Sequence, residues 1–326
     1  VTARDEEWSL LPDLAVSVET FEKQIAFLRE RFHIVPLEEM AARVRERQPC
    51  SNRDVAITFD DGYLDNYSNA YPVLKKHGVP ATIFLVVERI GGNGLFWWDK
   101  LARIVKSPAI QAVQWSNPPL RLFTPRLQSL LRRAAMPGAP LTPVTDYLKS
   151  LSRATREDVV RILEQAVGAD PKLSRRPRAF LSWDEIGEMS RNGISFGCHS
   201  YTHAILTEMD EGALVKEVAY ARNVLRDHLG TAVRGFSYPD GCLNAKVRAS
   251  VVEAGYEFAV QTTRSIACGP LDAYALPRKA VKEWHSKGCF RKFSANLFAL
   301  ELSGMMDSVS LRAVRRKNPY ESNGAH

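Results

Sequence analysis

The sequence lacks several features that would assign it to a familiar class. It has no run of 18 or more apolar residues and therefore predicts no membrane-spanning helix. Its five cysteines include no Cys-x-x-Cys pair, and their count is odd, which argues against a zinc knuckle and against a disulfide framework. No basic stretch alternates with aromatic residues, so the sequence indicates no nucleic-acid partner.

No signal peptide is visible either. The chain starts at Val1, and no basic segment followed by an apolar one comes after it. Together with the unpaired cysteines, this favours a reducing, cytoplasmic compartment. A chain that starts at valine is expected to have been trimmed or processed, so what precedes Val1 stays open.

What is present is ordinary for a globular protein. The 326 residues are 45% hydrophobic and 25% charged, enough to bury a substantial core. The net charge is +7, and the basic residues gather at residues 121–133, 175–178 and 287–317. A mildly basic surface is the simpler interpretation, and a face that meets an anionic envelope or glycan is the alternative.

Apolar runs and amphipathic segments alternate along most of the chain, which indicates an α/β fold with parallel strands. Strands are predicted at residues 55–59, 81–87, 194–198, 233–238 and 258–262, and helices at 66–77, 211–229 and 245–254. The alternation stops between about residues 91 and 178, where helical segments and proline-rich turns predict a helical insertion.

The sequence therefore predicts one catalytic domain over residues 1–290, interrupted by that insertion. Residues 291–326 are expected to form a C-terminal helix and a polar tail.

Two adjacent carboxylates, Asp60 and Asp61, end the first strand of the main alternation. Successive side chains on an extended strand point to opposite faces, so both can serve one site only where the strand gives way to a loop. Gly62 permits that turn. Taken alone, Asp-Asp-Gly after a strand is more often structural than functional.

Two histidines, His199 and His203, follow a strand far downstream. They converge if their segment is helical or tightly looped. The carboxyl ends of parallel strands form the catalytic face of an α/β barrel, so we expect these histidines to meet Asp60 and Asp61 there. Two imidazoles and one carboxylate suit a divalent metal, and the remaining carboxylate suits proton transfer. The sequence therefore predicts a hydrolytic metal centre.

These segments resemble the motifs of the polysaccharide deacetylases, the NodB-homology or carbohydrate esterase family 4 group. Residues 58–62 resemble the first motif, and residues 199–203 match the second, His-Ser/Thr-x-x-His. Residues 234–241 resemble the third, an arginine followed by Tyr-Pro-x-Gly. The resemblance covers about residues 17–278. It implies a distorted (β/α)7-type barrel with a helical insertion and removal of an N-acetyl group from an amino sugar.

The resemblance also implies roles for individual residues. Asp60 is the catalytic base, and Arg234 pairs with it and holds it ionised. The backbone N–H of Asp240 stabilises the oxyanion. Three residues hold a divalent metal, for which Zn²⁺ is the first expectation: Asp61, His199 and His203.

Two departures from the family pattern stand out. Asp240 occupies a position where members often carry tyrosine, so substrate preference is expected to differ. The family's Leu-x-His, whose histidine protonates the leaving amine, is missing after Val260. His285 is the remaining candidate for this general acid, and a solvated loop histidine is the alternative.

Other residues have two interpretations each. Trp97, Trp98 and Asp99 open the insertion, either as a lid whose aromatic rings stack on sugars or as an anchor for the insertion. Arg278 either contacts Asp60 or substrate, or forms a structural ion pair. Trp183 is expected to pack in the core.

Three functions follow from these features. The first is metal-dependent removal of an N-acetyl or other small N-acyl group from an amino sugar or glycan. The second is deformylation or deacylation of a small nucleotide- or lipid-linked sugar during glycan assembly. The third is sugar binding by a homologue with weak catalysis, which the missing acid suggests and the retained base Asp60 argues against.

Overall fold

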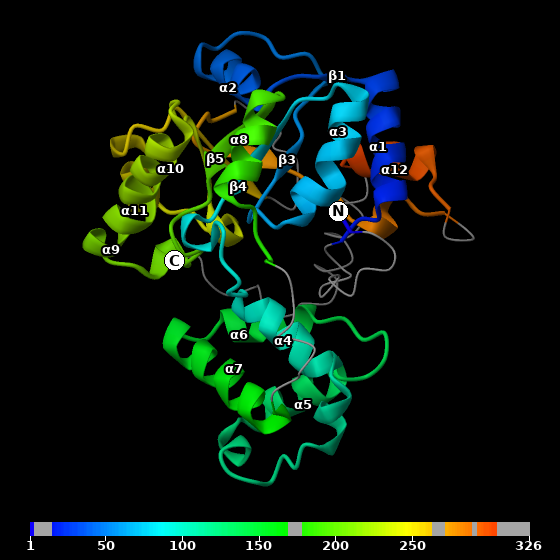
Figure 1. Ribbon diagram of the computed structural model, residues 1–326, viewed down its shortest axis with the longest axis vertical. Helices are drawn as coiled ribbons and strands as arrows, with labels where there is room; N and C mark the ends of the chain where they lie inside the picture. The colour runs from blue at the N-terminus through cyan, green and yellow to red at the C-terminus, as the bar shows by residue number, and fades with distance from the viewer. Residues whose placement is uncertain (3–14, 169–177, 263–270, 289–291, 305–326) are drawn as a thin grey trace, which may run out of the picture.

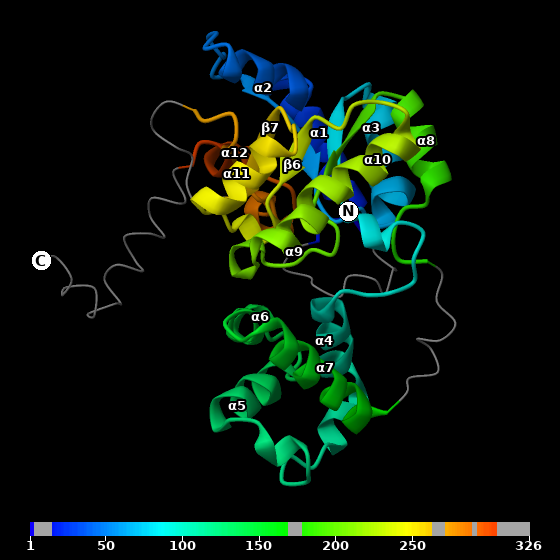
Figure 2. The ribbon, with the colours of Figure 1, turned by 90° about the vertical axis from the view of Figure 1, so that its left-hand side faces the viewer.

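The protein consists of a curled α/β body and a separate helical lobe (Figures 1 and 2). The computed structural model describes residues 1–2, 15–168, 178–262, 271–288 and 292–304. Among the helices in those ranges, none combines the length and apolarity needed to cross a bilayer.

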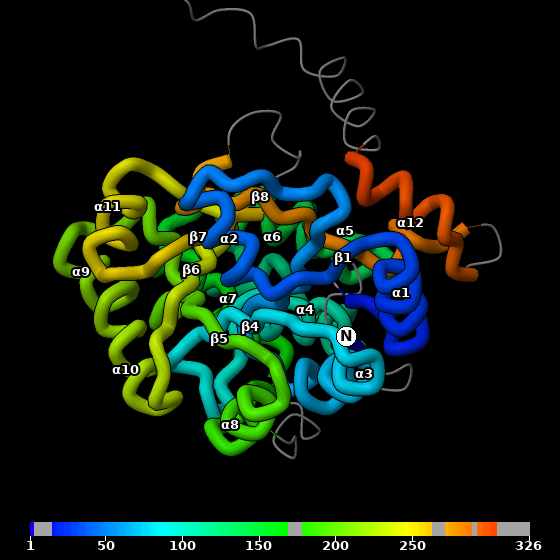
Figure 3. Tube along the Cα trace, turned by 90° about the horizontal axis from the view of Figure 1, so that it is seen from above, coloured from blue at the N-terminus to red at the C-terminus, as the bar shows by residue number. Residues whose placement is uncertain are grey.

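Six parallel strands form one sheet in chain order. They are β3 (Thr58–Phe59), β4 (Ala81–Leu85), β5 (Ile194–Cys198), β6 (Gly235–Ser237), β7 (Phe258–Thr262) and β8 (Leu276–Arg278). A separate parallel pair consists of β1 (His33–Ile34) and β2 (Asp54–Val55). The sheet curls into a half-barrel inside a ring of helices (Figure 3), which confirms the predicted barrel-like α/β fold.

The strand predicted at residues 55–59 is divided between two sheets. Val55 of β2 pairs with Ile34 of β1, whereas Thr58 of β3 pairs with Thr82 of β4. The described residues therefore form a six-stranded sheet and a separate pair, where about seven strands in one barrel were expected.

The carboxyl ends of the central strands lie at one edge. Leu85 at the end of β4 pairs with Cys198 at the end of β5, and Cys198 pairs with Phe236 in β6. All five residues of β4 are buried, as expected for a strand covered on both faces. Loops that leave these strands therefore start side by side.

Helices surround the sheet. They are α1 (Val18–Arg31), α2 (Leu37–Arg45), α3 (Tyr71–His77), α8 (Trp183–Arg191), α9 (Glu211–Val215), α10 (Ala221–Leu229), α11 (Ala245–Glu253) and α12 (Ala295–Leu302). The π-helical turn η1 (Asn66–Ala70) leads directly into α3, and the turn η6 (Lys216–Tyr220) joins α9 to α10. These segments form the two longer helices that the sequence predicts at residues 66–77 and 211–229.

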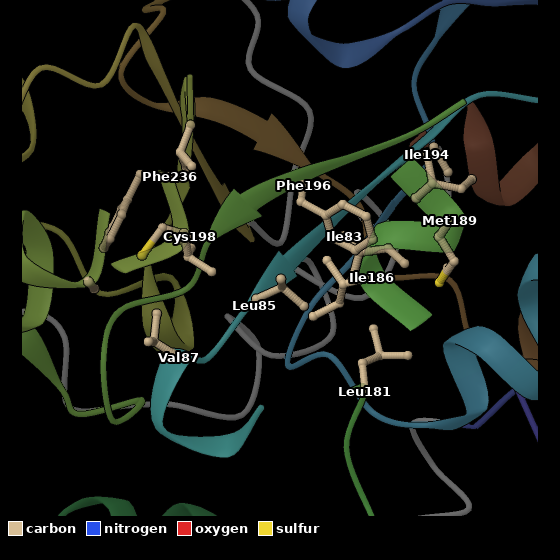
Figure 4. Close-up of a cluster of buried hydrophobic side chains, with 14 of the residues drawn as sticks. Ile83, Leu85, Val87, Leu181, Ile186, Met189, Ile194, Phe196, Cys198 and Phe236 are labelled. Carbon is tan, nitrogen blue, oxygen red and sulfur yellow. The ribbon is translucent and has the colours of Figure 1, made fainter. Parts of the chain in front are cut away.

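The main core lies between the sheet and these helices. Figure 4 shows Ile83 and Leu85 of β4 meeting Ile186 of α8, and these three side chains are fully buried. Each contributes roughly 1.5–3 kcal/mol of transfer free energy. Trp183, expected in the core, is half-buried at its edge and stacks on His228 with ring centroids 4.0 Å apart.

The helical lobe, residues 97–167, has an apolar core of its own. Its helices are α4 (Trp97–Lys106), α5 (Pro125–Ala134), α6 (Thr142–Lys149) and α7 (Arg153–Val167). The core contains Leu101, Leu131, Leu148 and Leu163, all fully buried. The predicted insertion is thus helical. The C-terminal helix expected after residue 290 is α12, and the polar tail from residue 305 lies outside the described residues.

Candidate active site

A tight turn at the end of β3 brings Asp60 and Asp61 to the same site. Asp61 and Gly62 have φ angles of +72° and +70°, and the Gly62 N–H donates to the Asp60 carbonyl over 2.9 Å. A Cβ on Gly62 would lie 2.8 Å from Cδ2 of Leu85. Both the conformation and the close approach favour glycine here. The turn that the sequence required therefore begins at Asp61 itself.

The two histidines lie on a tight loop after β5. The backbone N–H of His199 donates to the carbonyl of Leu85 over 2.8 Å. His203 has a φ angle of +62°, and its N–H donates to Ser200 Oγ over 2.9 Å. The buried carboxylate of Glu217 accepts hydrogen bonds from the backbone of this loop. This loop brings the two imidazole rings together, which their spacing in the sequence alone could not establish.

Asp61, His199 and His203 converge in the geometry of a metal site. Asp61 Oδ1 lies 3.5 Å from His203 Nε2 and 3.7 Å from His199 Nε2. In a tetrahedral zinc site with bonds of about 2.0–2.2 Å, ligand atoms lie about 3.3–3.6 Å apart. The two separations from Asp61 are close to that range, and the three ligand atoms all lie within 4.8 Å of one another.

The hydrogen bonds of these ligands also fit a cation. His199 Nδ1 lies 2.8 Å from the carbonyl of Ser237, which can only accept, so Nδ1 carries the proton and Nε2 offers its lone pair. Among the described residues, buried Asp61 Oδ1 has no hydrogen-bond partner. A carboxylate oxygen left without a donor beside two imidazole nitrogens is a suitable metal ligand.

Electrostatics at the triad favour a positive charge. Burial, and then the Asp60 carboxylate, raise the pKa of Asp61 well above its ordinary value. Burial lowers the pKa of His199 and lowers that of His203 to about 3. The imidazoles are therefore neutral, as metal ligands must be.

Asp60 is held by Arg278, the last residue of β8. The guanidinium donates to both carboxylate oxygens, over 2.8 Å and 2.6 Å, and also to Thr58 Oγ1 and Ser237 Oγ over 3.1 Å and 2.8 Å. Burial raises the pKa of Asp60, but the charge and hydrogen bonds of Arg278, together with the neighbouring histidines, lower it by more in total, so it lies well below its ordinary value. Asp60 is therefore ionised and fixed in orientation.

The prediction that Arg234 pairs with Asp60 is wrong. Arg234 precedes β6, at the amino end of the sheet, and its guanidinium lies 3.3 Å from Glu257 and 3.9 Å from Glu38. Asp60 lies at the carboxyl end, which a side chain at the start of β6 does not reach. Arg278 takes this place, so the interpretation in which it contacts Asp60 is correct.

Asp240 joins the active-site edge to the helical lobe. It lies in the turn η7 (Pro239–Gly241) after β6, with a φ angle of +56°. Its carboxylate contacts the ammonium group of Lys149, the last residue of α6. Burial raises the pKa of Asp240, but Lys149 and His203 lower it by more, so it lies below its ordinary value. Reasoning from sequence missed Lys149, because the insertion has no motif that places it.

The start of the lobe packs directly against His203, one of the three potential metal ligands. The Trp98 ring makes an edge-to-face contact with His203, with centroids 4.8 Å apart. Its indole N–H donates to the Tyr63 hydroxyl over 3.0 Å, and that hydroxyl donates to Asp99 Oδ2 over 2.9 Å. These contacts support the anchoring interpretation for Trp98 and Asp99, and Trp97 packs on the core of the lobe. Stacking on sugars stays a prediction.

His285 lies in a different environment from the triad. It sits in the turn η8 (Glu283–Ser286), where Nδ1 is 3.1 Å from Oε1 of Glu301 in α12 and 3.2 Å from the backbone nitrogen of Lys282. Among the described residues, Asp61, His199 and His203 form the only cluster of three or more potential ligands that could hold a metal ion. The structure does not bring His285 into that cluster, because η8 packs against α1 and α12.

Comparison with known sequences agrees with the motifs. The sequence profile of the polysaccharide deacetylase family matches residues 47–259, about two thirds of the chain. A poly-β-1,6-N-acetyl-D-glucosamine N-deacetylase of Staphylococcus epidermidis is 24% identical over 204 residues, 61% of this chain and 66% of that protein. Its Staphylococcus aureus counterpart is 31% identical over 94 residues, 28% of this chain and 32% of that protein. The aligned regions thus span less than two thirds of the lengths of these relatives.

Comparison with solved structures supports the fold. The Streptococcus pyogenes deacetylase PplD, solved with acetate, has a TM-score of 0.57 and 16% identity, covering 93% of both chains. IcaB from Ammonifex degensii has a TM-score of 0.51 and 19% identity, covering 82% of this chain and 85% of that one.

Proposed function

Because the chain belongs to the polysaccharide deacetylase family, we propose that it is a metal-dependent hydrolase that removes N-acetyl groups from the amino sugars of a glycan. One observation carries the proposal: Asp61, His199 and His203 converge beside an ionised Asp60. The names of the staphylococcal relatives make β-1,6-linked N-acetylglucosamine oligomers the first substrate to test.

The donor set determines what the metal would contribute. A divalent cation held by Asp61, His199 and His203 would polarise the amide carbonyl and acidify a water molecule when bound. Zinc is the first expectation, because two neutral imidazoles and one carboxylate are a common catalytic zinc set. Other divalent metals accept the same ligands.

The protein's own residues handle protons and charge. Asp60 accepts the proton of the attacking water, and the two hydrogen bonds from Arg278 aim its carboxylate. The backbone N–H of Asp240, in the turn after β6, donates to the carbonyl oxygen as negative charge develops. Since His285 lies against Glu301, we assign the return of the proton to the leaving amine to Asp60 as well.

The test measures amine and acetate release from N-acetyl and N-formyl amino sugars and from β-1,6-linked oligomers by zinc-loaded protein. Asp60→Asn should lower kcat at least about a hundredfold without changing bound zinc. His285→Ala serves as the matched histidine control and should leave kcat unchanged. Absence of release from every acylated amino sugar would overturn the function, and full activity of Asp60→Asn would overturn the assignment of the base.

A second candidate is deacylation of a small nucleotide- or lipid-linked sugar. Two contacts between the lobe and the edge of the site favour a bounded substrate: Lys149 with Asp240, and Arg153 Nη1 with Thr202 Oγ1 at 3.5 Å. Values of kcat/KM that fall as oligomer length increases would support this candidate, and values that rise would support the polymer. The third alternative, a protein that only binds sugars, would not need a carboxylate kept ionised and oriented as that of Asp60 is.

A further inference from the structure

The helical lobe carries most of the net positive charge of the molecule. Residues 97–167 contain eleven Lys and Arg against five Asp and Glu, a net charge of +6 compared with +7 for the whole chain. Residues 100–145 contain seven of these basic residues and no acidic one. The acidic residues of the lobe lie at the start of α4 and on α6 and α7, so α5 and the turns before it carry charge of one sign.

One face of α5 presents this charge to the outside. Its buried residues are Leu127, Leu131 and Ala134, whereas Arg126 and Arg133 are exposed on the other face. α5 lies farther from the body than α4 and α6 do, in both views (Figures 1 and 2).

Exposed apolar residues stand at both ends of this face. Leu122 is 77% exposed and Met136 is 61% exposed. Within α5, Arg126, Ser129 and Arg133 are three and four residues apart, which is the spacing of one helix face. Leu122 lies in the turn η4 (Leu120–Leu122) just before α5, and Met136 lies just after its end. We call the exposed residues Arg121, Leu122, Arg126, Arg132, Arg133 and Met136 the α5 patch.

The composition of the patch selects among anionic partners. Sugars and nucleic-acid bases bind to exposed aromatic rings, but the aromatic residues around α5 are buried or half-buried, as for Phe123, Trp115 and Tyr147. Arg126 and Arg132 cover Tyr147 and Trp115, at 5.3 Å and 5.6 Å from the ring centroids. Cations interleaved with protruding Leu and Met side chains are typical of a surface that meets lipid headgroups and the acyl boundary below them.

We propose that the α5 patch docks the protein on an anionic lipid surface. The arginines contact headgroup phosphates, and Leu122 and Met136 enter the interface at either end of the helix. The proposal is independent of the deacetylase activity, because α5 lies farther from β3–β8 than α4 and α6 do (Figures 1 and 2).

Co-sedimentation tests the proposal with vesicles of phosphatidylcholine that contain phosphatidylglycerol, and with vesicles of phosphatidylcholine alone. We expect binding to the anionic vesicles only, declining as salt is added. The triple variant Arg121→Gln, Arg126→Gln and Arg133→Gln should lower the partition coefficient at least about tenfold. Leu122→Ser combined with Met136→Ser should remove the binding that persists at high salt.

A control variant removes the same charge from the body: Arg29→Gln, Lys75→Gln and Arg191→Gln. It should bind anionic vesicles as the unmodified protein does, and both triple variants should keep the same melting temperature. Equal loss of binding in the two variants would overturn the proposal, because net charge alone would then explain it. Binding to soluble heparin without binding to vesicles would overturn the proposal in favour of a polyanionic polymer as the partner.

Discussion

At the scale of single residues, Asp60 and Asp61 show how neighbouring identical side chains acquire different properties. The left-handed turn directs both toward one site. Arg278 then lowers the pKa of Asp60, whereas burial and the charge of Asp60 raise that of Asp61. The first is therefore suited to be a base, and the second would be kept ionised by a bound cation.

Replacing Arg278 tests this distinction. Arg278→Gln removes the charge that keeps the pKa of Asp60 low, so the acid limb of the profile of kcat/KM against pH should move to higher pH. We expect kcat/KM near neutral pH to fall about a hundredfold or more. Arg234→Gln, at the other end of the sheet, should leave both the profile and the rate unchanged. An effect of Arg234→Gln as large as that of Arg278→Gln would contradict the assignment.

At the scale of elements, the loops after the strands and the first turn of α4 form the site together. The ends of β3 and β5 were predictable, because apolar runs followed by Asp-Asp or His-x3-His mark a strand and its loop. The sequence could not show whether Arg278 or Arg234 pairs with Asp60. Only the direction of β6 and β8 in the sheet shows which arginine reaches that carboxylate. The contact of Trp98 with His203 is tertiary and has no local signal.

The contact of Trp98 with His203 should support metal affinity. Trp98→Ala removes the ring that restrains His203, and we expect zinc affinity to fall about tenfold to a hundredfold, as for other supporting residues of zinc sites. Trp98→Phe keeps a ring at that position and should lose much less. Calorimetric titration with zinc measures both, and equal affinities of the alanine variant and the unmodified protein would contradict the role.

Asp99 at the start of α4 should make stability depend on pH. Burial raises its pKa from an ordinary value near 4 to about 6 in the folded state. Between these values the folded state binds more protons than the unfolded state, so stability falls as pH rises from about 4 to about 6. The expected loss is on the order of 2 kcal/mol.

The matched variant for this prediction is Asp99→Asn, which still accepts a hydrogen bond from Tyr63. Urea unfolding of both proteins with a chelator present, at several pH values, isolates the contribution of this side chain. The free energy of unfolding of Asp99→Asn should fall less between pH 4 and 6 than that of the unmodified protein. Parallel curves would show that Asp99 ionises normally.

At the scale of the whole molecule, the lobe and the body meet at the active-site edge. The alternation of strands and helices made the body predictable, and its interruption located the insertion. The position of the lobe over the strand ends was not predictable, because it depends on contacts such as Lys149 with Asp240 that join segments 91 residues apart.

A double-mutant cycle on Lys149 and Asp240 measures this junction. The pair is partly exposed, so Lys149→Ala should change the free energy of unfolding by less than about 1 kcal/mol. KM should change more than stability, because the pair lies at the edge of the site. The exchanged pair Lys149→Asp with Asp240→Lys should recover part of the KM lost by Lys149→Asp alone. No recovery would show that Asp240 acts without its partner.

Leu85 contacts both loops of the candidate metal site. Its carbonyl fixes the start of the His199 loop, and its side chain limits the space at Gly62 in the turn that carries Asp61. One residue of β4 therefore contacts both segments that carry the potential metal ligands, by a hydrogen bond on one side and by packing on the other.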